Sequence, residues 1–404
     1  MGQGFYVKKA IIRKQQTVTM SSLGNNGRFA NQIFQYAFLR IYAKGHDLVI
    51  ETPEWIGQYL FGHNDRPISQ ELPQVRVEGR TEDLLADALL SKTKPPFTSV
   101  DFSGYFQFHT KYYAPHKEYF RSLFQPVSEI EVIMKKTLNK LRSIGKTIVG
   151  LHLRLSDYGY GPFFIAPIKW YIDCLENLWE TLNEPVLFLA SDEPKKVFKD
   201  FAKYKPITSK DLGIELSKAD FYTDFYLLSK CDILAISNSS YSFAACMLND
   251  GCELFLRPDL LTEKLILFDP WDSEVLLRKE EKIQLALDYL RAGKWQQVNI
   301  ICRQIMKTHP FDAAILAEIS LNKIMSNKQF NYTMLAEITI NELMHDNRVI
   351  ESFFNIKEIA LQEIGDFDVA KHVTYYKRLL QLDPQNQEAK LMLDNMIRLQ
   401  RAAI

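Results

Sequence analysis

Short apolar runs alternate with amphipathic stretches through the first two thirds of the chain, and each apolar run ends in polar residues. Thr17 to Leu23 predicts a short buried strand, and Asn31 to Lys44 predicts a helix because its apolar residues keep to one face. Gly45 is expected to end that helix, and Asp47 to Glu51 predicts a second strand. A unit of strand, loop, helix and strand builds parallel sheets.

The same pattern returns from residue 147. Three further strands are predicted, at Thr147 to Arg154, Pro185 to Ala190 and Asp232 to Ser237. In open α/β sheets ligands gather at the carboxyl ends of the strands, where His152, Asp192 and Asn238 would fall. The pattern therefore predicts two α/β lobes, residues 1–145 and 146–278, which face each other.

The last third of the chain changes character, because Pro and Gly become rare and amphipathic helical periods dominate. Gly293-Lys-Trp295, Lys328-Gln-Phe330 and Gly365-Asp-Phe367 recur at intervals close to the ~34-residue period of tetratricopeptide repeats. Residues 279–404 are therefore predicted to form an all-α, repeat-like domain, with a plain helical bundle as the alternative. Such a domain could bind a protein partner, mediate self-association or extend an acceptor site.

The composition of the chain limits the kinds of binding partner and the location to be expected. The 49 basic and 49 acidic residues cancel, so no net field favours nucleic acid or an anionic membrane as the main partner. No run approaches the ~20 apolar residues that span a bilayer, and a cytoplasmic location is expected, free or peripheral to the inner face of a membrane. The five cysteines form no Cys-x-x-Cys pair, which disfavours a zinc ribbon or a disulfide framework.

The first candidate for chemistry is the loop Gly24-Asn-Asn-Gly-Arg-Phe-Ala-Asn-Gln32. Its glycines let the backbone approach a ligand, Arg28 adds a positive charge, and Asn31 begins the helix whose amide groups face the loop. The structural alternative is a strand-to-helix turn that Asn31 caps. A Rossmann dinucleotide site is weaker, because Gly24 and Gly27 do not have its glycine spacing.

A second candidate is the strand that carries His152 and Arg154. The two residues alternate with leucines and so project from one face. A buried arginine needs an anion, and a diphosphate offers two charged groups to a planar guanidinium. The structural alternative is an ion pair of Arg154 with a carboxylate beside a hydrogen-bonded core histidine. Asp157 could be that carboxylate or a catalytic base.

Two polar loops complete the candidates. Ser191-Asp192-Glu-Pro194 opens a helix, and Asp192 is expected to cap it, or else to bind a nucleobase or ribose. Asn238-Ser-Ser-Tyr-Ser242 leads into the apolar stretch from Phe243, so its hydroxyls and amides would lie at a helix N-terminus, where partial positive charge favours phosphate. Together the loops suggest one anion site for a phosphorylated donor.

Several of these segments resemble the motifs of the α-1,2-fucosyltransferases of glycosyltransferase family 11. The resemblance covers about residues 17 to 260 and does not reach the helical tail. Its ordered motifs are Gly27-Arg-Phe-Ala-Asn-Gln-Ile-Phe-Gln-Tyr-Ala37, Gly104-Tyr-Phe-Gln107, His152-Leu-Arg154 through Asp157-Tyr158, Ser191-Asp192, and Asp224 through Asn238-Ser-Ser-Tyr-Ser-Phe-Ala-Ala-Cys-Met-Leu-Asn249.

The resemblance implies a GT-B fold, in which two Rossmann-like lobes face a cleft, with residues 1–145 on the acceptor side and residues 146–278 binding the GDP-sugar. It also implies an inverting transfer of fucose from GDP-fucose, without a required metal or other cofactor, to a glycan hydroxyl. It implies that Arg154 holds the β-phosphate and His152 contacts the donor. Further donor-binding residues implied by it are Gly27, Arg28, Asn31, Asp192, Asn238, Ser239, Ser240 and Tyr241.

One departure concerns Leu155, where the family usually has a second arginine. Protein O-fucosyltransferases resemble this region with a single arginine, so donor binding is expected to survive the change. Three functions stay open: an α-1,2-fucosyltransferase acting on galactose, a transferase for another GDP-sugar or linkage, and a non-catalytic scaffold with a degenerate transferase lobe. Asp157 is the candidate base for the first two.

Overall fold

The structure is a computed structural model. It describes residues 16–77, 82–90, 94–213, 216–277, 281–310, 312–313 and 316–317, with single residues at 377, 393 and 397. The chain divides into two compact units. Unit 1 comprises Met1–Leu153 and Ile168–Leu277, and unit 2 comprises Arg154–Pro167 and Arg278–Ile404.

Unit 1 holds two sheets. In the first sheet the strand order is β2-β1-β4-β3, and each neighbouring pair is parallel. Its strands are β1 (Thr17–Thr19), β2 (Val49–Glu51), β3 (Gln74–Val77) and β4 (Val100–Gly104). Its helices are α1 (Phe29–His46), α2 (Ile56–Phe61), α3 (Glu82–Leu90), α4 (Lys117–Ser122) and α5 (Ser128–Arg142).

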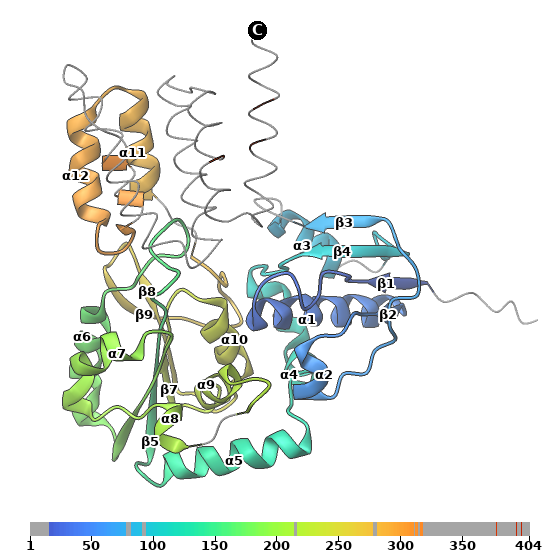
Figure 1. The fold of residues 1–404 in the computed structure, drawn as a ribbon, viewed down its shortest axis with the longest axis horizontal. Coiled ribbons are helices and arrows are strands. Elements are labelled where there is room, and N and C mark those ends of the chain that lie inside the picture. The colour runs from blue at the N-terminus through green and yellow to red at the C-terminus, as the bar shows by residue number, and fades with distance from the viewer. Residues whose placement is uncertain are drawn as a thin grey trace, which may run out of the picture. The chain divides into compact units, whose positions relative to one another are not determined.

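The second sheet has the order β6-β5-β7-β8-β9, with β9 antiparallel at the edge (Figure 1). Its strands are β5 (Thr147–Leu153), β6 (Pro185–Ser191), β7 (Ile233–Ala235), β8 (Leu254–Asp259) and β9 (Lys264–Leu267). Its helices are α6 (Ile168–Leu178), α7 (Pro194–Val197), α8 (Ser209–Leu212), α9 (Phe221–Leu228) and α10 (Ser240–Leu248). The predicted α/β class with two lobes built on parallel strands is confirmed.

Helix α1 is the core of the first lobe, and nearly all of its apolar side chains are buried. The ring of Phe38 stacks on that of Phe106, with centroids 4.0 Å apart. The prediction that Gly45 ends this helix is wrong, because the helix continues to His46. Asp47 takes the left-handed conformation there (φ 53°), and its N–H donates to the carbonyl of Ala43.

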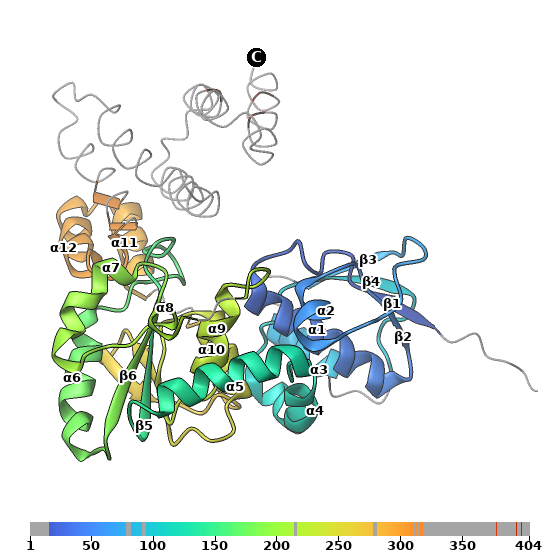
Figure 2. The same cartoon turned by 60° about the horizontal axis from the view of Figure 1, so that its bottom comes forward.

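Helix α5 leads from the first lobe to β5, as Figure 2 shows. Acidic residues lie in its first turn and basic residues in its last, which complements the helix dipole. The predicted division near residue 145 falls in the connection after this helix. The domain bounds 1–145, 146–278 and 279–404 stay a prediction.

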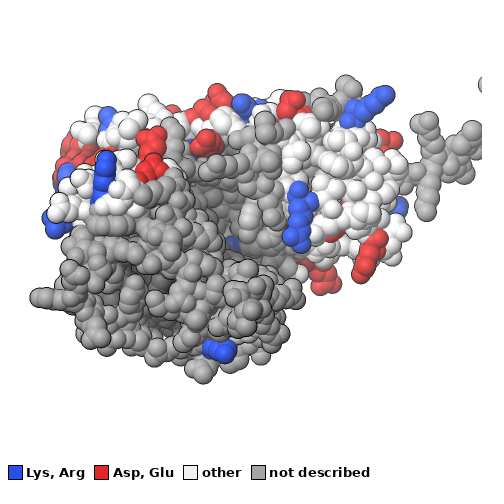
Figure 3. All heavy atoms as spheres, turned by 90° about the horizontal axis from the view of Figure 1, so that it is seen from above, with Lys and Arg blue, Asp and Glu red and all other residues white. Residues whose placement is uncertain are grey.

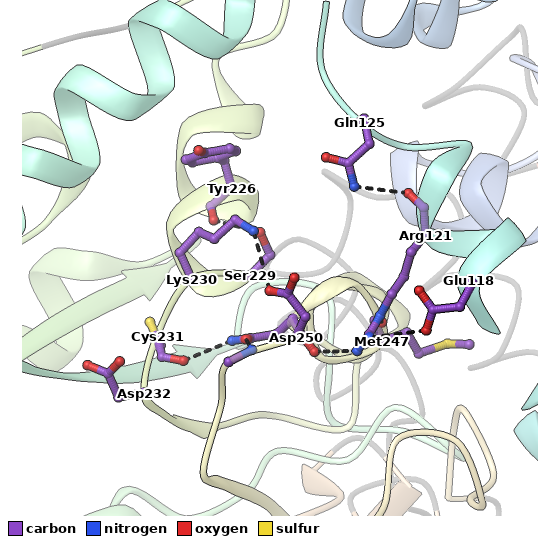
Figure 4. A network of polar contacts seen from close by, with 12 residues as sticks. Glu118, Arg121, Gln125, Tyr226, Ser229, Lys230, Cys231, Asp232, Met247 and Asp250 are labelled. Atoms are coloured by element: carbon purple, nitrogen blue, oxygen red, sulfur yellow. Dashed lines mark hydrogen bonds and ion pairs between the residues drawn. The ribbon is translucent and has the colours of Figure 1, made fainter.

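Side chains from the two lobes meet inside unit 1. The ring of Phe29 at the start of α1 packs against Phe221 and Phe225 of α9, with centroids 4.8 and 4.9 Å away. At the C-terminal end of α10, Arg121 of α4 donates to the carbonyl oxygens of Met247 (3.0 Å) and Asn249 (2.6 Å), as Figure 4 shows in part. The two lobes are therefore connected through α9 and through the C-terminal end of α10.

Unit 2 contains α11 (Glu281–Arg291) and α12 (Trp295–Ile305), drawn in orange in Figure 1. Their buried side chains form a common apolar core with Tyr160, which comes from the segment Arg154–Pro167. Phe330 and Phe367 of the predicted repeat lie outside the described residues, so the repeat-like tail stays a prediction.

The described surface shows both signs of charge. On the face drawn in Figure 3, acidic and basic side chains are interspersed. Among the described residues, no helix combines the length and apolar character that crossing a bilayer requires.

Candidate functional site

The turn between β1 and α1 is shaped by glycines. Gly24 and Gly27 have φ values of +90° and +81°, which side chains rarely adopt, and a Cβ atom on Gly27 would clash with the side chain of Asn31. Gln35 donates to the carbonyls of Asn26 (3.0 Å) and Gly104 (2.9 Å) and so holds the turn against β4. Gly24, Gly27 and Gln35 therefore hold this turn in one backbone conformation.

Asn31 joins the first lobe to the second. Its side-chain oxygen accepts hydrogen bonds from Gln107 Nε2 at 2.6 Å and from Ser240 Oγ at 3.3 Å. Gln107 comes from the segment after β4, and Ser240 is the first residue of α10. Three motifs that are far apart in the sequence thus converge on one amide group.

Arg28 lies at the N-cap of α1 in extended conformation, and its side chain does not cap the helix. The residue is exposed, which places its charge on the surface of the turn. The structural alternative in which Asn31 caps the helix is wrong, because Asn31 is the third residue of a helix that begins at Phe29. Its amide instead spans the two lobes.

The turn between β7 and α10 is built from buried polar side chains. The Oγ of Ser237 lies 2.8 Å from Nδ1 of His152 on β5. The amide oxygen of Asn238 accepts from the N–H of Leu277 (2.8 Å), and its amide nitrogen donates to the carbonyl of Leu277 (3.1 Å). Asn238 thus ties the end of unit 1 to the carboxyl end of the sheet.

The residues that open α10 have structural partners as well. Ser239 is the N-cap, and its Oγ accepts from the N–H of Tyr241 at 3.3 Å. The hydroxyl of Tyr241 donates to the carbonyl of Phe221 at 2.6 Å. These two hydroxyls are hydrogen-bonded within the protein, and they thereby fix the position and direction of α10. The positive end of its helix dipole, at the N-terminus, favours an anion.

His152 is a buried and neutral group. Its residue is 5% exposed, and its ring centroid lies 5.3 Å from that of Tyr241. Burial lowers the pKa of His152 to about 4, although the nearby carboxylate of Asp192 acts in the opposite direction. At neutral pH the imidazole therefore offers a hydrogen bond rather than a positive charge.

Asp192 follows β6, the strand paired with β5. The expectation that it caps the next helix is wrong, because the N-cap of α7 is Glu193 and no side chain caps that helix. The Oγ of Ser191 accepts from the N–H of Glu193 at 3.1 Å, so the serine satisfies the turn. A nucleoside contact of Asp192 stays a prediction.

Arg154 and Asp157 form an ion pair at the start of the segment that belongs to unit 2. Nε and Nη2 of Arg154 lie 2.7 and 2.6 Å from Oδ1 of Asp157. The structure thus contains the predicted structural alternative: an arginine paired with a carboxylate, and a hydrogen-bonded core histidine at position 152. Phosphate binding by Arg154 and proton transfer to Asp157 remain predictions.

Three further residues support the site but were not assigned roles from the sequence. Gln107 and Ser237 hold Asn31 and His152, and both lie in segments that the sequence singled out, although neither was given a role of its own. Arg257 on β8 is 3% exposed, and it donates to the carbonyl of Glu274 at 2.8 Å. Burial lowers the pKa of Arg257 to about 10. Nothing in the sequence separates this arginine from a surface residue.

Within the part of the chain that the structure describes, no group of three or more His, Cys, Asp or Glu side chains is arranged to hold a metal ion. The expectation of a transfer without a metal is independent of that finding and stays untested.

Comparison with known proteins gives matches to solved structures alone. No protein-family model and no curated protein matches the chain. A structure of the NodZ α-1,6-fucosyltransferase soaked with GDP-fucose is 16% identical, covers 63% of this chain and 99% of that chain, and has a TM-score of 0.45. The fucosyltransferase NodZ from Bradyrhizobium is 13% identical and covers 64% and 100%, with a TM-score of 0.45.

A mutant of Arabidopsis thaliana FUT1 in complex with GDP is also similar. It is 15% identical and covers 62% of this chain and 72% of that chain, with a TM-score of 0.43. These are similarities of fold at low identity, and the functional proposal rests instead on the motifs and on the contacts between them.

Proposed function

We propose that the protein is an inverting, GDP-fucose-dependent glycosyltransferase of GT-B type that moves L-fucose to a glycan hydroxyl, forming an α-1,2 linkage to galactose. The observation that carries this proposal is the convergence on Asn31, which accepts hydrogen bonds from Gln107 and from Ser240. The glycine turn at the start of α1 and the N-terminus of α10 therefore lie together, although Asn31 and Ser240 are 209 positions apart in the sequence.

The pair of helix starts suits a diphosphate. Gly27 has no Cβ and takes a φ of +81°, so the turn can pack tightly beside Asn31, and Arg28 adds a positive charge next to it. The N-terminus of α10, fixed by Ser239 and Tyr241, adds the partial positive charge of a helix dipole. Arg154 leaves the adjacent strand β5 and would hold the β-phosphate in two places.

The proposed transfer is a single displacement. The acceptor oxygen attacks the anomeric carbon of fucose, the bond from that carbon to the β-phosphate oxygen breaks, and GDP leaves with the electron pair. Arg154 and the start of α10 would stabilise the charge that develops on the leaving phosphate. The acceptor hydroxyl loses its proton to Asp157, which serves as the general base. The neutral imidazole of His152 would donate or accept one hydrogen bond at the donor.

The donor and the linkage need separate experiments. Purified protein is incubated with GDP-fucose or GDP-mannose and a panel of glycan acceptors, and released GDP is measured. We expect GDP release that depends on GDP-fucose and on a galactose-terminated acceptor, and linkage analysis should give an α-1,2 product. Release from GDP-mannose alone would reassign the donor, and a different product linkage would overturn the α-1,2 assignment.

A scaffold without catalysis is the competing function. The contacts around Asn31 bring the two helix starts together, and a lobe without activity would keep them for stability alone. Absence of GDP release and of GDP binding would favour the scaffold. The tail could still bind a protein partner or mediate self-association in either case.

A further inference from the structure

The segment Arg154–Pro167 carries the predicted catalytic pair, and it folds against the helices of unit 2. Its tip is a tight turn, in which the N–H of Gly159 donates to the carbonyl of Phe163 at 2.6 Å and the N–H of Phe163 donates to that of Tyr160 at 2.9 Å. Gly159 and Gly161 have φ values of +124° and +44°, which suit glycine. The turn therefore has a defined shape of its own.

Two hydrogen bonds anchor this turn to the chain after α12. The N–H of Gly161 donates to Oδ2 of Asp312 at 2.8 Å, and the N–H of Ile165 donates to the carbonyl of Thr308 at 2.8 Å. Asp312 is fully buried. A buried carboxylate costs free energy unless it accepts hydrogen bonds. The amide of Gly161 supplies such a bond, so moving this amide away from Asp312 would be unfavourable.

Aromatic contacts continue the connection in both directions. The guanidinium of Arg154 lies 5.9 Å from the ring centre of Tyr158, whose ring lies 5.4 Å from that of Phe163. The ring of Phe163 lies 5.4 Å from that of Tyr160. Tyr160 is buried in the apolar core of α11 and α12.

The packed rings of Tyr158, Phe163 and Tyr160 thus connect Arg154 to the apolar core of α11 and α12. A second ring contact supports the anchor, because the ring of Phe164 lies 5.8 Å from that of His309. The segment has the helices of unit 2 on one side of its turn and the predicted catalytic pair at its start.

We propose that Asp312 is a positioning residue for the transfer reaction: by holding Gly161, it fixes the conformation of the segment that presents Arg154 and Asp157. The inference rests on the proposed function. It gives the helical domain a role in catalysis, besides any role in binding a partner. A helical domain that served only as a docking module would leave this segment and its kinetics unaffected.

The test uses the full chain and compares Asp312→Ala with Asp312→Asn, which keeps an oxygen that can accept from Gly161. We expect Asp312→Ala to lower kcat for GDP-fucose at least tenfold while KM for the acceptor changes less than twofold. Asp312→Asn should recover kcat to within about threefold of the wild type. Gln296→Ala, an exposed change on α12, is the matched control and should leave kcat unchanged.

Amide hydrogen exchange supplies a readout that does not depend on turnover. Asp312→Ala should speed exchange at residues 159–165 relative to the wild type and to Gln296→Ala. If Asp312→Ala does not fold, Phe164→Leu takes its place, because it weakens the contact with His309 without leaving a buried donor unpaired.

The outcomes separate the two proposals. A wild-type protein without GDP-fucose turnover overturns the proposed function and the inference with it. An active wild type, combined with unchanged kcat in Asp312→Ala and Phe164→Leu, overturns the positioning role alone. Equal loss of kcat in Asp312→Ala and Asp312→Asn would also overturn it, because the retained oxygen should rescue the turn.

Discussion

Two segments that follow neighbouring strands of the second sheet are held in place by opposite means. After β7, Ser237, Asn238 and Ser239 are buried, and their side chains hydrogen-bond to partners within unit 1. After β5, the segment Arg154–Pro167 begins with an ion pair and is anchored by the helices of unit 2. The first segment is fixed by its own lobe, and the second depends on an added domain.

The difference separates two kinds of contribution to an anion site. The hydroxyls and amides after β7 fix the direction of α10, so their loss should affect stability as well as activity. The charges after β5 can act on a ligand directly, so their loss should affect activity far more than stability. Substitutions in the two segments therefore test the comparison.

The largest effect is expected from Arg154→Ala. Removal of a charged group that stabilises a leaving phosphate should lower kcat for GDP-fucose by a factor of about a hundred or more. Arg76→Ala is the control, since Arg76 is an exposed arginine on β3 whose Nε donates to the side chain of Gln74. Near-normal consumption of GDP-fucose by Arg154→Ala would remove this residue from the site.

A smaller loss is expected from Asn31→Ala. The change leaves Gln107 and Ser240 without their shared acceptor and loosens the contact between the two helix starts. We expect kcat/KM to fall about tenfold and the free energy of unfolding to fall by about 1–3 kcal/mol. Steady-state kinetics and denaturant unfolding measure both, with the exposed Asn139→Ala on α5 as control. Wild-type kinetics in Asn31→Ala would argue against a site shared by the two lobes.

Arg121→Ala should affect stability more than chemistry. Arg121 donates to two carbonyls at the C-terminal end of α10 (Figure 4), whereas Ser240 of the candidate site begins that helix. Loss of these charged hydrogen bonds should lower the free energy of unfolding by about 1–3 kcal/mol. Arg121→Lys should recover part of the loss. Equal thermal unfolding midpoints for all three proteins would show that the end of α10 needs no such support.

The smallest expected effect is a pH dependence from His152. Its pKa is lowered to about 4 in the folded protein, so the unfolded chain binds a proton more readily. The stability that the protein gains by burying His152 as a neutral imidazole is complete above the usual pKa of 6.5 and is lost as pH falls toward 4. Between pH 7 and pH 5 the loss should be about 1–2 kcal/mol.

Other buried groups titrate in the same range. His309 acts in the same direction, whereas burial raises the pKa of Asp224 to about 6 and acts in the opposite one. The difference in unfolding free energy between the wild type and His152→Gln isolates the single group. A difference that stays constant from pH 7 to pH 5 would show that His152 is not buried as a neutral imidazole.

Short apolar runs bounded by polar residues predicted β1, β2, β5, β6 and β7, whereas β3, β4, β8 and β9 were not predicted. Ends of elements were harder. The helix continued past Gly45 because Asp47 could take the left-handed turn instead. Asp192 was expected to cap a helix, but the neighbouring Ser191 satisfies that turn. Which residue ends or caps a helix depends on competition between neighbouring residues, and hydrophobic periodicity carries no information about that competition.

The candidate site shows a similar limit. The polar segments themselves could be read from the chain, but their contacts could not, because Gln107 and Ser240 meet Asn31 only through tertiary packing. Arg257 and Asp312 are charged residues that are buried, and the local sequence around each of them does not predict this burial. The anchoring of the segment after β5 by the helical domain also depends on a contact 151 positions away in the sequence, between Gly161 and Asp312.

The central claim is that the two helix starts and the strand ends form a site for a GDP-sugar. Isothermal titration calorimetry of GDP into the full-length protein tests it most directly. The account predicts saturable binding at one site, lost in Arg154→Ala and displaced by GDP-fucose. Absence of any binding heat at millimolar GDP, in protein that is folded by circular dichroism, would contradict it.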